Sequence, residues 1–323
     1  MDKPKRQNGR DILEILNTEW STAPTAEIAL DNSDFTPISQ KKNWAYSDDT
    51  YWAVGTTCKT LPSSLFEPGY SEGQGFTLKE MVNNLDDIID LPDSESEKVL
   101  AEIKEFTSKK EVFNKLGFLY KRGILLFGPP GSGKTITVQQ LIKMFTREMD
   151  GIAVLCGHPK LLTGALEDFR KLEPDRQILV IMEDLEALIV RFCESDFLSL
   201  LDGESQLQNV VYVATTNYPE NLDIRFKDRP SRFDTVRRIG MPSRAARKTY
   251  IQAKLPDLGE STLQEYLDNT EDYSIAYIKE LIILIQCFGY SLEDATARLN
   301  KMRNSTPNSN DKDGGVGFGF AGK

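Results

Sequence analysis

One short stretch restricts the fold of this chain more than any other. The apolar run GILLF at 123–127 leads into GPPGSGKT, and a helical pattern follows at once. The GxxxxGK[ST] spacing is that of a phosphate-binding loop, whose glycines let backbone N–H groups approach phosphate oxygens. A strand before the loop and a helix after it point the positive end of the helix at the anion. The stretch therefore predicts a nucleotide site on a strand–loop–helix unit of an α/β fold.

The loop and the first turn after it supply the predicted phosphate-binding residues. They are Gly128, Pro129, Pro130, Gly131, Ser132, Gly133, Lys134, Thr135 and Ile136. The Lys134 ammonium is expected near the β- and γ-phosphates, and the Thr135 hydroxyl is expected to bind Mg²⁺. ATP and Mg²⁺ are thus the expected ligands.

A second apolar run, ILVIM at 178–182, leads directly into Glu183 and Asp184. In phosphate-loop NTPases an acid at the end of such a strand supports Mg²⁺, usually through water, and a neighbouring acid polarises the attacking water. Acids in a first helical turn are also common for dipole reasons alone. The phosphate loop upstream favours the catalytic interpretation, with Thr135 and Glu183 at the metal.

A third apolar run, VVYVATT, ends at Asn217, and a group of arginines follows in RFKDRPSRFD. The Asn217 carboxamide is predicted to hydrogen-bond to the attacking water or to the γ-phosphate. Asparagine after a strand is also a common turn residue, so this assignment depends on its place after the loop and the acid pair. Arg225, Arg229 and Arg232 are candidates for arginine fingers, which neutralise charge on phosphate in the transition state.

Composition and pattern divide the 323 residues into four parts. They are a partly β accessory region at 1–95, an ATPase core at 96–240, a small helical lid at 241–300 and a flexible glycine-rich tail at 301–323. The accessory region contains a helical pattern at 10–20 and a strand-like pattern at 50–60. An amphipathic helix then carries Val99, Leu100, Ile103 and Phe106 on one face. In the core, strands alternate with helices, which predicts a parallel sheet.

The overall composition excludes several classes of protein. A net charge of −10, with 27% charged and 40% hydrophobic residues, is globular and argues against a broadly basic nucleic-acid surface. The four cysteines lack CxxC spacing, which disfavours a disulfide framework or zinc site and favours a cytoplasmic protein. No apolar run approaches the roughly 18 residues that cross a bilayer. We therefore expect no membrane contact.

In this order, GPPGSGKT, the acid-ended strand, LLDG, ATTN and RPSRFD resemble the motifs of the AAA family of ring-forming ATPases. The resemblance covers about residues 95–300. It implies that Asn217 is the first sensor, and that Arg229 and Arg232 are fingers supplied to a neighbouring subunit. It therefore also implies a homo-oligomer, expected to be a hexameric ring.

The acid pair is inverted relative to the Asp-Glu order usual in this family, since the chain reads IMEDLEAL. One alignment puts Met182 at the aspartate position and leaves Mg²⁺ without its acid. The other puts Glu183 at the metal and Asp184 at the water, and it also aligns the four residues that follow, Leu185, Glu186, Ala187 and Leu188. The inversion and LGFLYKRGILLF are similar to the mitochondrial translocase of the Rieske iron–sulfur protein. The segments LTG, EDLEAL, ATTNYPE and YSIAYIKEL are more similar to soluble bacteriophage and bacterial AAA ATPases.

This resemblance implies Mg²⁺-dependent ATP hydrolysis in an oligomeric ring that remodels or chaperones a protein partner. The alternatives are a nucleic-acid motor or loader, which the acidic composition disfavours, and a nucleotide-gated scaffold with little turnover. Three features depart from the family pattern. The spacing from Asp223 to Arg229 is one residue longer than usual, which leaves open whether Arg229 or Arg232 is the main finger. HPKLLTGALEDF offers Leu161 or Leu162 where ring translocases carry an aromatic pore residue, and YSIAYIKELI has no arginine for a second sensor.

Overall fold

The structure is a computed structural model that describes residues 43–47, 50–54, 58–72, 75–82, 88–92, 95–202, 207–227 and 231–304. The chain divides into two compact units between Lys59 and Thr60. In the first unit, β1 (Asn43–Ser47) and β2 (Thr50–Val54) form an antiparallel hairpin. The strand predicted within 50–60 is therefore confirmed over its first half. The predicted helix at 10–20 and residues 305–323 of the predicted tail lie outside the described residues.

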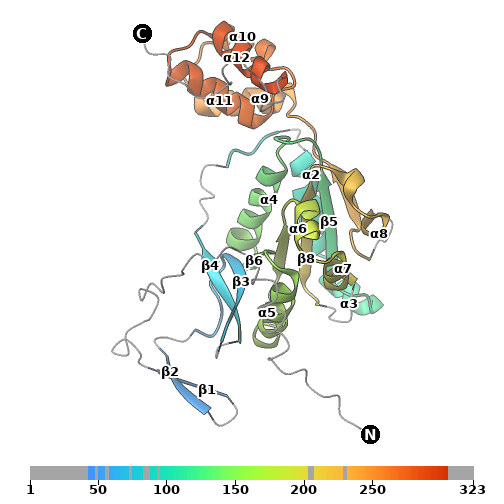
Figure 1. The fold of residues 1–323 in the computed structure, drawn as a ribbon. Helices are drawn as coiled ribbons and strands as arrows, with labels where there is room; N and C mark the ends of the chain where they lie inside the picture. The colour runs from blue at the N-terminus through green and yellow to red at the C-terminus, as the bar shows by residue number, and fades with distance from the viewer. Residues whose placement is uncertain are drawn as a thin grey trace. The chain divides into compact units, whose positions relative to one another are not determined.

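The second unit is built on a seven-stranded sheet of order β4-β3-β6-β7-β8-β5-β9 (Figure 1). Its strands are β3 (Leu65–Ser71), β4 (Gly75–Met81), β5 (Lys121–Phe127), β6 (Ile152–Leu155), β7 (Ile178–Met182), β8 (Val210–Thr216) and β9 (Thr235–Arg238). Neighbouring strands are parallel except for the antiparallel pair β3 and β4. The predicted α/β fold with a parallel core sheet is confirmed.

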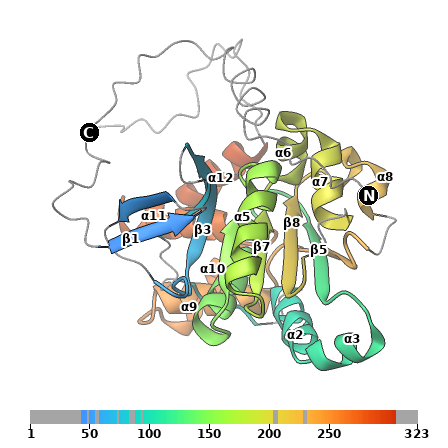
Figure 2. The same ribbon diagram turned by 90° about the horizontal axis from the view of Figure 1, so that it is seen from below.

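Helices connect these strands and cover both faces of the sheet. They are α2 (Glu95–Thr107), α3 (Lys110–Leu116), α4 (Lys134–Lys143), α5 (Pro159–Leu172), α6 (Leu185–Arg191), α7 (Glu194–Asp202) and α8 (Ile224–Lys227), with a π-helical turn η3 (Met144–Glu148) after α4 and a 3₁₀ turn η4 (Pro219–Asn221) after β8. Side chains alternate between the two faces of each strand. Val180 accordingly belongs to the core cluster that includes residues of α5 and α7, whereas Ile181 belongs to the cluster that includes residues of α2 and α4. The helices α5 and α7 can be followed in Figure 2. Val99, Ile103 and Phe106 are buried, which confirms the amphipathic helix.

The region predicted to be a helical lid contains four helices around a hydrophobic core of their own (Figure 1). They are α9 (Arg244–Lys254), α10 (Glu260–Asn269), α11 (Ile275–Gln286) and α12 (Leu292–Asn304). Ser243 and Ser274 cap α9 and α11 by accepting a hydrogen bond from a backbone N–H of the first turn, which satisfies donors that the helix itself leaves free. In the described part of the chain, no helix has both the length and the apolar character needed to span a membrane.

The hairpin of β3 and β4 extends the core sheet, although it belongs to the first 95 residues. Residues 65–66 of β3 pair with residues 153–154 of β6, and Phe66 is buried in the core. Phe76 of β4 packs where Gly164 leaves space on α5, since a Cβ at Gly164 would lie 2.2 Å from the Phe76 ring. The sheet that carries the ATPase motifs thus begins well before residue 95.

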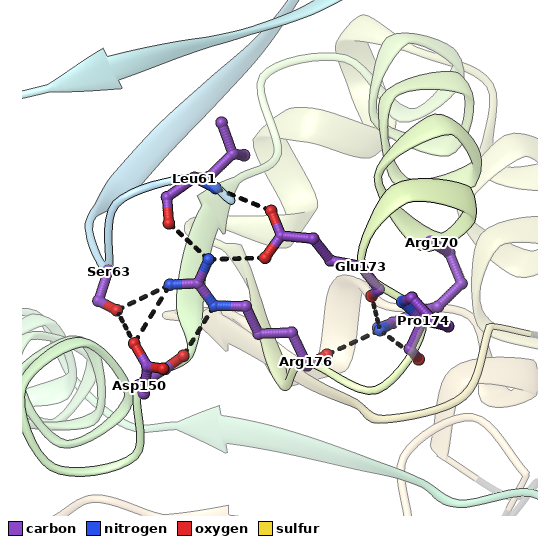
Figure 3. Close-up of polar contacts among 7 residues, drawn as sticks. All are labelled: Leu61, Ser63, Asp150, Arg170, Glu173, Pro174 and Arg176. Carbon is purple, nitrogen blue, oxygen red and sulfur yellow. Dashed lines mark hydrogen bonds and ion pairs between the residues drawn. The ribbon is translucent and has the colours of Figure 1, made fainter. Parts of the chain in front are cut away.

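A polar network around the largely buried Arg176 and Glu173 holds the entry to β3 in place (Figure 3). Arg176 donates through Nη1 to Glu173 Oε2 at 2.8 Å and to the Leu61 carbonyl at 2.5 Å. Its Nη2 and Nε donate to Ser63 Oγ and to the Asp150 carbonyl, both at 2.7 Å. The Leu61 N–H donates in turn to Glu173 Oε1 at 2.8 Å. One guanidinium therefore connects three segments that are far apart in the sequence.

Candidate active site

The loop between β5 and α4 has the backbone geometry that a phosphate loop requires. Gly131 and Gly133 adopt φ values of 75° and 106°, a region that glycine enters without strain. A Cβ on Gly131 would lie 2.8 Å from Ser274 Oγ, so the loop packs directly against the residue that caps α11. The loop therefore lies between the N-termini of α4 and α11.

A pocket of about 460 Å³ opens beside this loop. Its lining residues are Pro130, Gly131, Gly133, Lys134, Thr135, Ile136, Glu183, Asp184, Thr215, Asn217, Ile275 and Ala276. The pocket lies where β5, β7 and β8 end, and open parallel sheets bind ligands outside the carboxyl ends of their strands. The loop lysine and threonine, both acids and the asparagine singled out from the sequence thus share one pocket.

A second pocket of about 220 Å³ shares Gly133, Ile136 and Ile275 with the first. Most of its other walls come from the start of α2, from the segment after β9 and from Leu91, which precedes α2 in the chain. They are Leu91, Glu95, Ser96, Ser132, Ile239, Gly240, Met241, Pro242 and Ala246. Its aliphatic walls suit a flat, weakly polar group such as a nucleobase. The larger pocket thus collects Lys134, both acids and Asn217, and the smaller pocket adjoins it through Gly133, Ile136 and Ile275.

Lys134 is the only cationic residue among the described residues that line the larger pocket. Its Nζ donates to the Gly128 and Pro129 carbonyls at 2.8 and 3.0 Å and to Asn217 Oδ1 at 2.7 Å. Burial lowers the pKa of Lys134, and the charges of Asp184 and Glu186 act in the opposite direction. Because an ammonium has three protons, a bound phosphate must replace at least one of these acceptors.

The two neighbouring acids contact different partners. The Glu183 carboxylate accepts a hydrogen bond from the Thr135 side chain; burial raises the pKa of Glu183, Thr135 opposes this, and the charge of Asp184 adds to it. Carboxylate and hydroxyl oxygens are ligands suited to Mg²⁺, which needs only one or two from the protein when phosphates and water supply the rest. Within the described residues, no three His, Cys, Asp or Glu side chains form a metal cluster, and such a Mg²⁺ site requires none.

Asp184 projects toward Asn217 instead. It adopts the left-handed conformation, with φ 48° and ψ 58°, which Asp tolerates better than most residues. Its backbone N–H donates to Thr215 Oγ1 at 3.0 Å, and its Oδ1 accepts from Asn217 Nδ2 at 3.1 Å. The acid and the carboxamide are therefore held side by side at the mouth of the pocket.

Glu186 is a third acid at this site, and sequence reasoning did not single it out. Its Oε1 accepts a hydrogen bond from the Asn217 backbone N–H at 3.0 Å. In the sequence, Glu186 is an ordinary acid in the first turn of a helix, where the helix dipole explains it. The contact between Glu186 and Asn217 can be seen only in the structure, because it depends on where β8 ends.

Comparison with known families agrees with this geometry. Residues 124–241 match the model of the ATPase family associated with various cellular activities (AAA). The match begins in β5 and ends after β9, and it includes every residue described above on the loop, the acid strand and the asparagine strand. This segment is an AAA ATPase domain.

Curated relatives resemble about half of the chain. A cell division cycle protein 48 homolog of Archaeoglobus fulgidus is 26% identical over 192 residues, which is 53% of this chain and 26% of that protein. An ATPase family gene 2 protein of Schizosaccharomyces pombe is 27% identical over 50% of this chain and 22% of its own length. A Bos taurus ATPase family gene 2 protein homolog B is 32% identical over 49% and 23%. The chain spans about a quarter of the length of these relatives.

The arginines that follow β8 in the AAA domain differ in their surroundings. Arg232 is 6% exposed, and it donates to Asp202 Oδ2 through Nε and to the Arg225 carbonyl through Nη1, both at 2.7 Å. Arg225 is exposed and pairs with Glu194 at 3.1 Å. Arg229 lies outside the described residues. Arg232 is thus held by its own chain in this arrangement.

Two further segments bear on how the AAA domain works. Two leucines are predicted to occupy the place of the aromatic pore residue. Leu162 is buried in the core, so of these two leucines only the half-buried Leu161 has a side chain near the surface. In the region predicted to be a lid, α11 begins at Ile275 after the Ser274 cap. Ile275 and Ala276 are the lid residues that line the phosphate pocket.

Proposed function

We propose that this chain hydrolyses ATP with Mg²⁺ in an AAA ring that remodels or chaperones a protein partner. The ATPase assignment is supported above all by the pocket in which Lys134, Thr135 and the two acids meet beside a glycine-rich loop. Lys134 and the loop N–H groups would hold the phosphates. The adjoining smaller pocket, with its aliphatic side chains, would hold the base.

Each acid has a distinct proposed role. Thr135 and Glu183 would hold Mg²⁺, which neutralises charge on the β- and γ-phosphates when bound. Asp184 would accept a proton from the attacking water, and Asn217 would orient that water. The burial of Met182 in the sheet core supports this register, because a buried methionine at the end of β7 has no contact with the pocket.

The ring is proposed from the charge of the site and from the family. In the described part of the chain, the phosphate pocket contains Lys134 and no arginine, so a finger from a neighbouring subunit would supply the missing charge. Arg229 and Arg232 are the proposed fingers, and Arg232 would first have to leave Asp202. A homohexamer is the proposed assembly, because fingers supplied in trans require a neighbouring subunit. The motifs EDLEAL and ATTNYPE support the bacteriophage or bacterial cytoplasmic type.

Lys134→Ala should weaken ATP binding by about tenfold or more, since it removes the pocket's own cation, and tenfold corresponds to about 1.4 kcal/mol. Titration with a fluorescent ATP analogue measures this. Lys143→Ala is the matched control, because Lys143 belongs to the same helix but lines a different pocket. Equal affinities for wild type and Lys134→Ala would refute nucleotide binding at this loop.

If the chain forms a ring and acts on a protein client, two further results are expected for the wild type. Light scattering should show assembly to about six copies in the presence of ATP and Mg²⁺, and an unfolded protein substrate should raise the ATPase rate. Stimulation by single-stranded DNA instead would favour the nucleic-acid motor. Assembly and ATP binding without turnover would favour the scaffold.

A further inference from the structure

We infer that Glu186 is a positioning residue for this reaction, which holds Asn217 in place and, through Asn217, the Asp184 carboxylate and the Lys134 ammonium. The inference rests on the proposed ATPase function, because that function gives the three groups their roles. Glu186 itself does not line the phosphate pocket. Glu186 acts through the backbone of Asn217.

The contact between Glu186 and Asn217 lies just after the end of β8, where the chain leaves the sheet. Strand β8 ends at Thr216, so the Asn217 N–H lies just beyond the strand. Glu186 Oε1 accepts from it at 3.0 Å, and the next N–H, that of Tyr218, donates to Thr216 Oγ1 at 3.0 Å. Side chains therefore hold the turn after β8, and Glu186 is the one that connects this turn to α6.

The Asn217 side chain connects the two halves of the site. Its Oδ1 accepts from Lys134 at 2.7 Å and its Nδ2 donates to Asp184 at 3.1 Å. A carboxamide has one oxygen and one nitrogen on opposite sides, so both contacts require one orientation of the side chain. Moving the Asn217 backbone would displace both contacts at once.

The surroundings of Glu186 show that it is more than an acid capping a helix. Its Oε2 is buried and has no hydrogen-bond partner within the described part of the chain. A carboxylate that served only the helix dipole would stay hydrated, because burying an unpartnered charged oxygen costs free energy. The fold tolerates this cost at the residue that binds Asn217. The Glu186 charge also favours the protonated form of Lys134.

Two substitutions of Glu186 distinguish the effect of its side-chain length from the effect of its charge. Glu186→Gln loses the charge but keeps an oxygen that can accept from the Asn217 N–H. Glu186→Asp keeps the charge but is one methylene too short to reach it. Turnover at saturating ATP should fall about tenfold to a hundredfold in Glu186→Asp, the loss expected when reacting groups shift by about 1 Å, while ATP affinity changes less than about threefold. In Glu186→Gln, turnover should stay within about threefold of wild type.

Hydrogen–deuterium exchange of the peptide that contains Asn217 provides a measurement that does not depend on activity. The Asn217 amide should exchange at least about tenfold faster in Glu186→Asp than in wild type or Glu186→Gln. Glu293→Ala is the control, since it removes an exposed acid from the first turn of α12, and it should change neither turnover nor this exchange.

Three results would overturn the inference. They are equal turnover in Glu186→Asp and wild type, unchanged exchange of the Asn217 amide in Glu186→Asp, or a Glu186→Gln variant as slow as Glu186→Asp. A wild type that binds ATP without turnover would refute the proposed function instead. The exchange comparison would then still decide whether Glu186 holds Asn217.

Discussion

Asp184→Asn should reduce ATP hydrolysis by roughly a hundredfold or more, the contribution typical of a general base, while ATP binding stays close to that of wild type. The substitution preserves shape and backbone. Asparagine also tolerates the left-handed conformation seen at position 184, and its oxygen can still accept from Asn217 Nδ2. Only the ability to take a proton from water is lost.

Steady-state phosphate release and equilibrium binding of ATP, measured on the same preparation, test this prediction. Asp272→Asn is the matched control, because Asp272 is another aspartate with positive φ, 57°, and it lies outside the pocket. Its turnover should equal that of wild type. Normal hydrolysis by Asp184→Asn would show that the acids have been assigned in the wrong order, and Glu183 would then become the candidate base.

Arg176→Leu should lower the free energy of unfolding by about 3 kcal/mol or more, because removing one partner of a buried ion pair leaves the other charge uncompensated. Glu173 and Arg176 have side chains only 8% and 12% exposed. The substitution also removes the donors to Leu61, Ser63 and Asp150, so the entry to β3 would keep only the hydrogen bond from the Leu61 N–H to Glu173 in this network. Urea denaturation followed by circular dichroism measures the loss.

Two comparisons identify the cause of that loss. The double substitution Glu173→Gln with Arg176→Leu should recover part of the stability, because the remaining side chain is then neutral and still accepts from Leu61. Lys171→Leu removes a cation from an exposed pair with Asp168 and should cost less than about 1 kcal/mol. If Arg176→Leu unfolds at the same urea concentration as wild type, the network does not stabilise the sheet.

Most elements of the core could be predicted because their signals are local. The strands β5, β7 and β8 each contain an unbroken apolar run, as expected where helices cover both faces of a parallel sheet. The helix α2 shows its buried face by the spacing of its apolar residues. The phosphate loop requires consecutive residues in a fixed order, so its sequence and its geometry coincide at Gly131 and Gly133.

Features that depend on long-range contacts could not be predicted in this way. The strand β3 pairs with β6 across about 90 residues of chain, and nothing in the composition near residue 65 identifies its partner. Arg232 is buried and pairs with Asp202, although its polar neighbours in the sequence predict an exposed side chain. In both cases the partner comes from another segment, and only the packed sheet brings the two together.

By itself, the sequence determined the strand–loop–helix unit, the acid pair and the alternating α/β order, because each depends on neighbouring residues. The tertiary structure decided what those residues contact. It directs Glu183 to Thr135 and Asp184 to Asn217, and it brings Glu186 to the Asn217 backbone. The physical reason is that parallel strands end at one edge of the sheet, so residues separated by a helix or more in the chain become neighbours there.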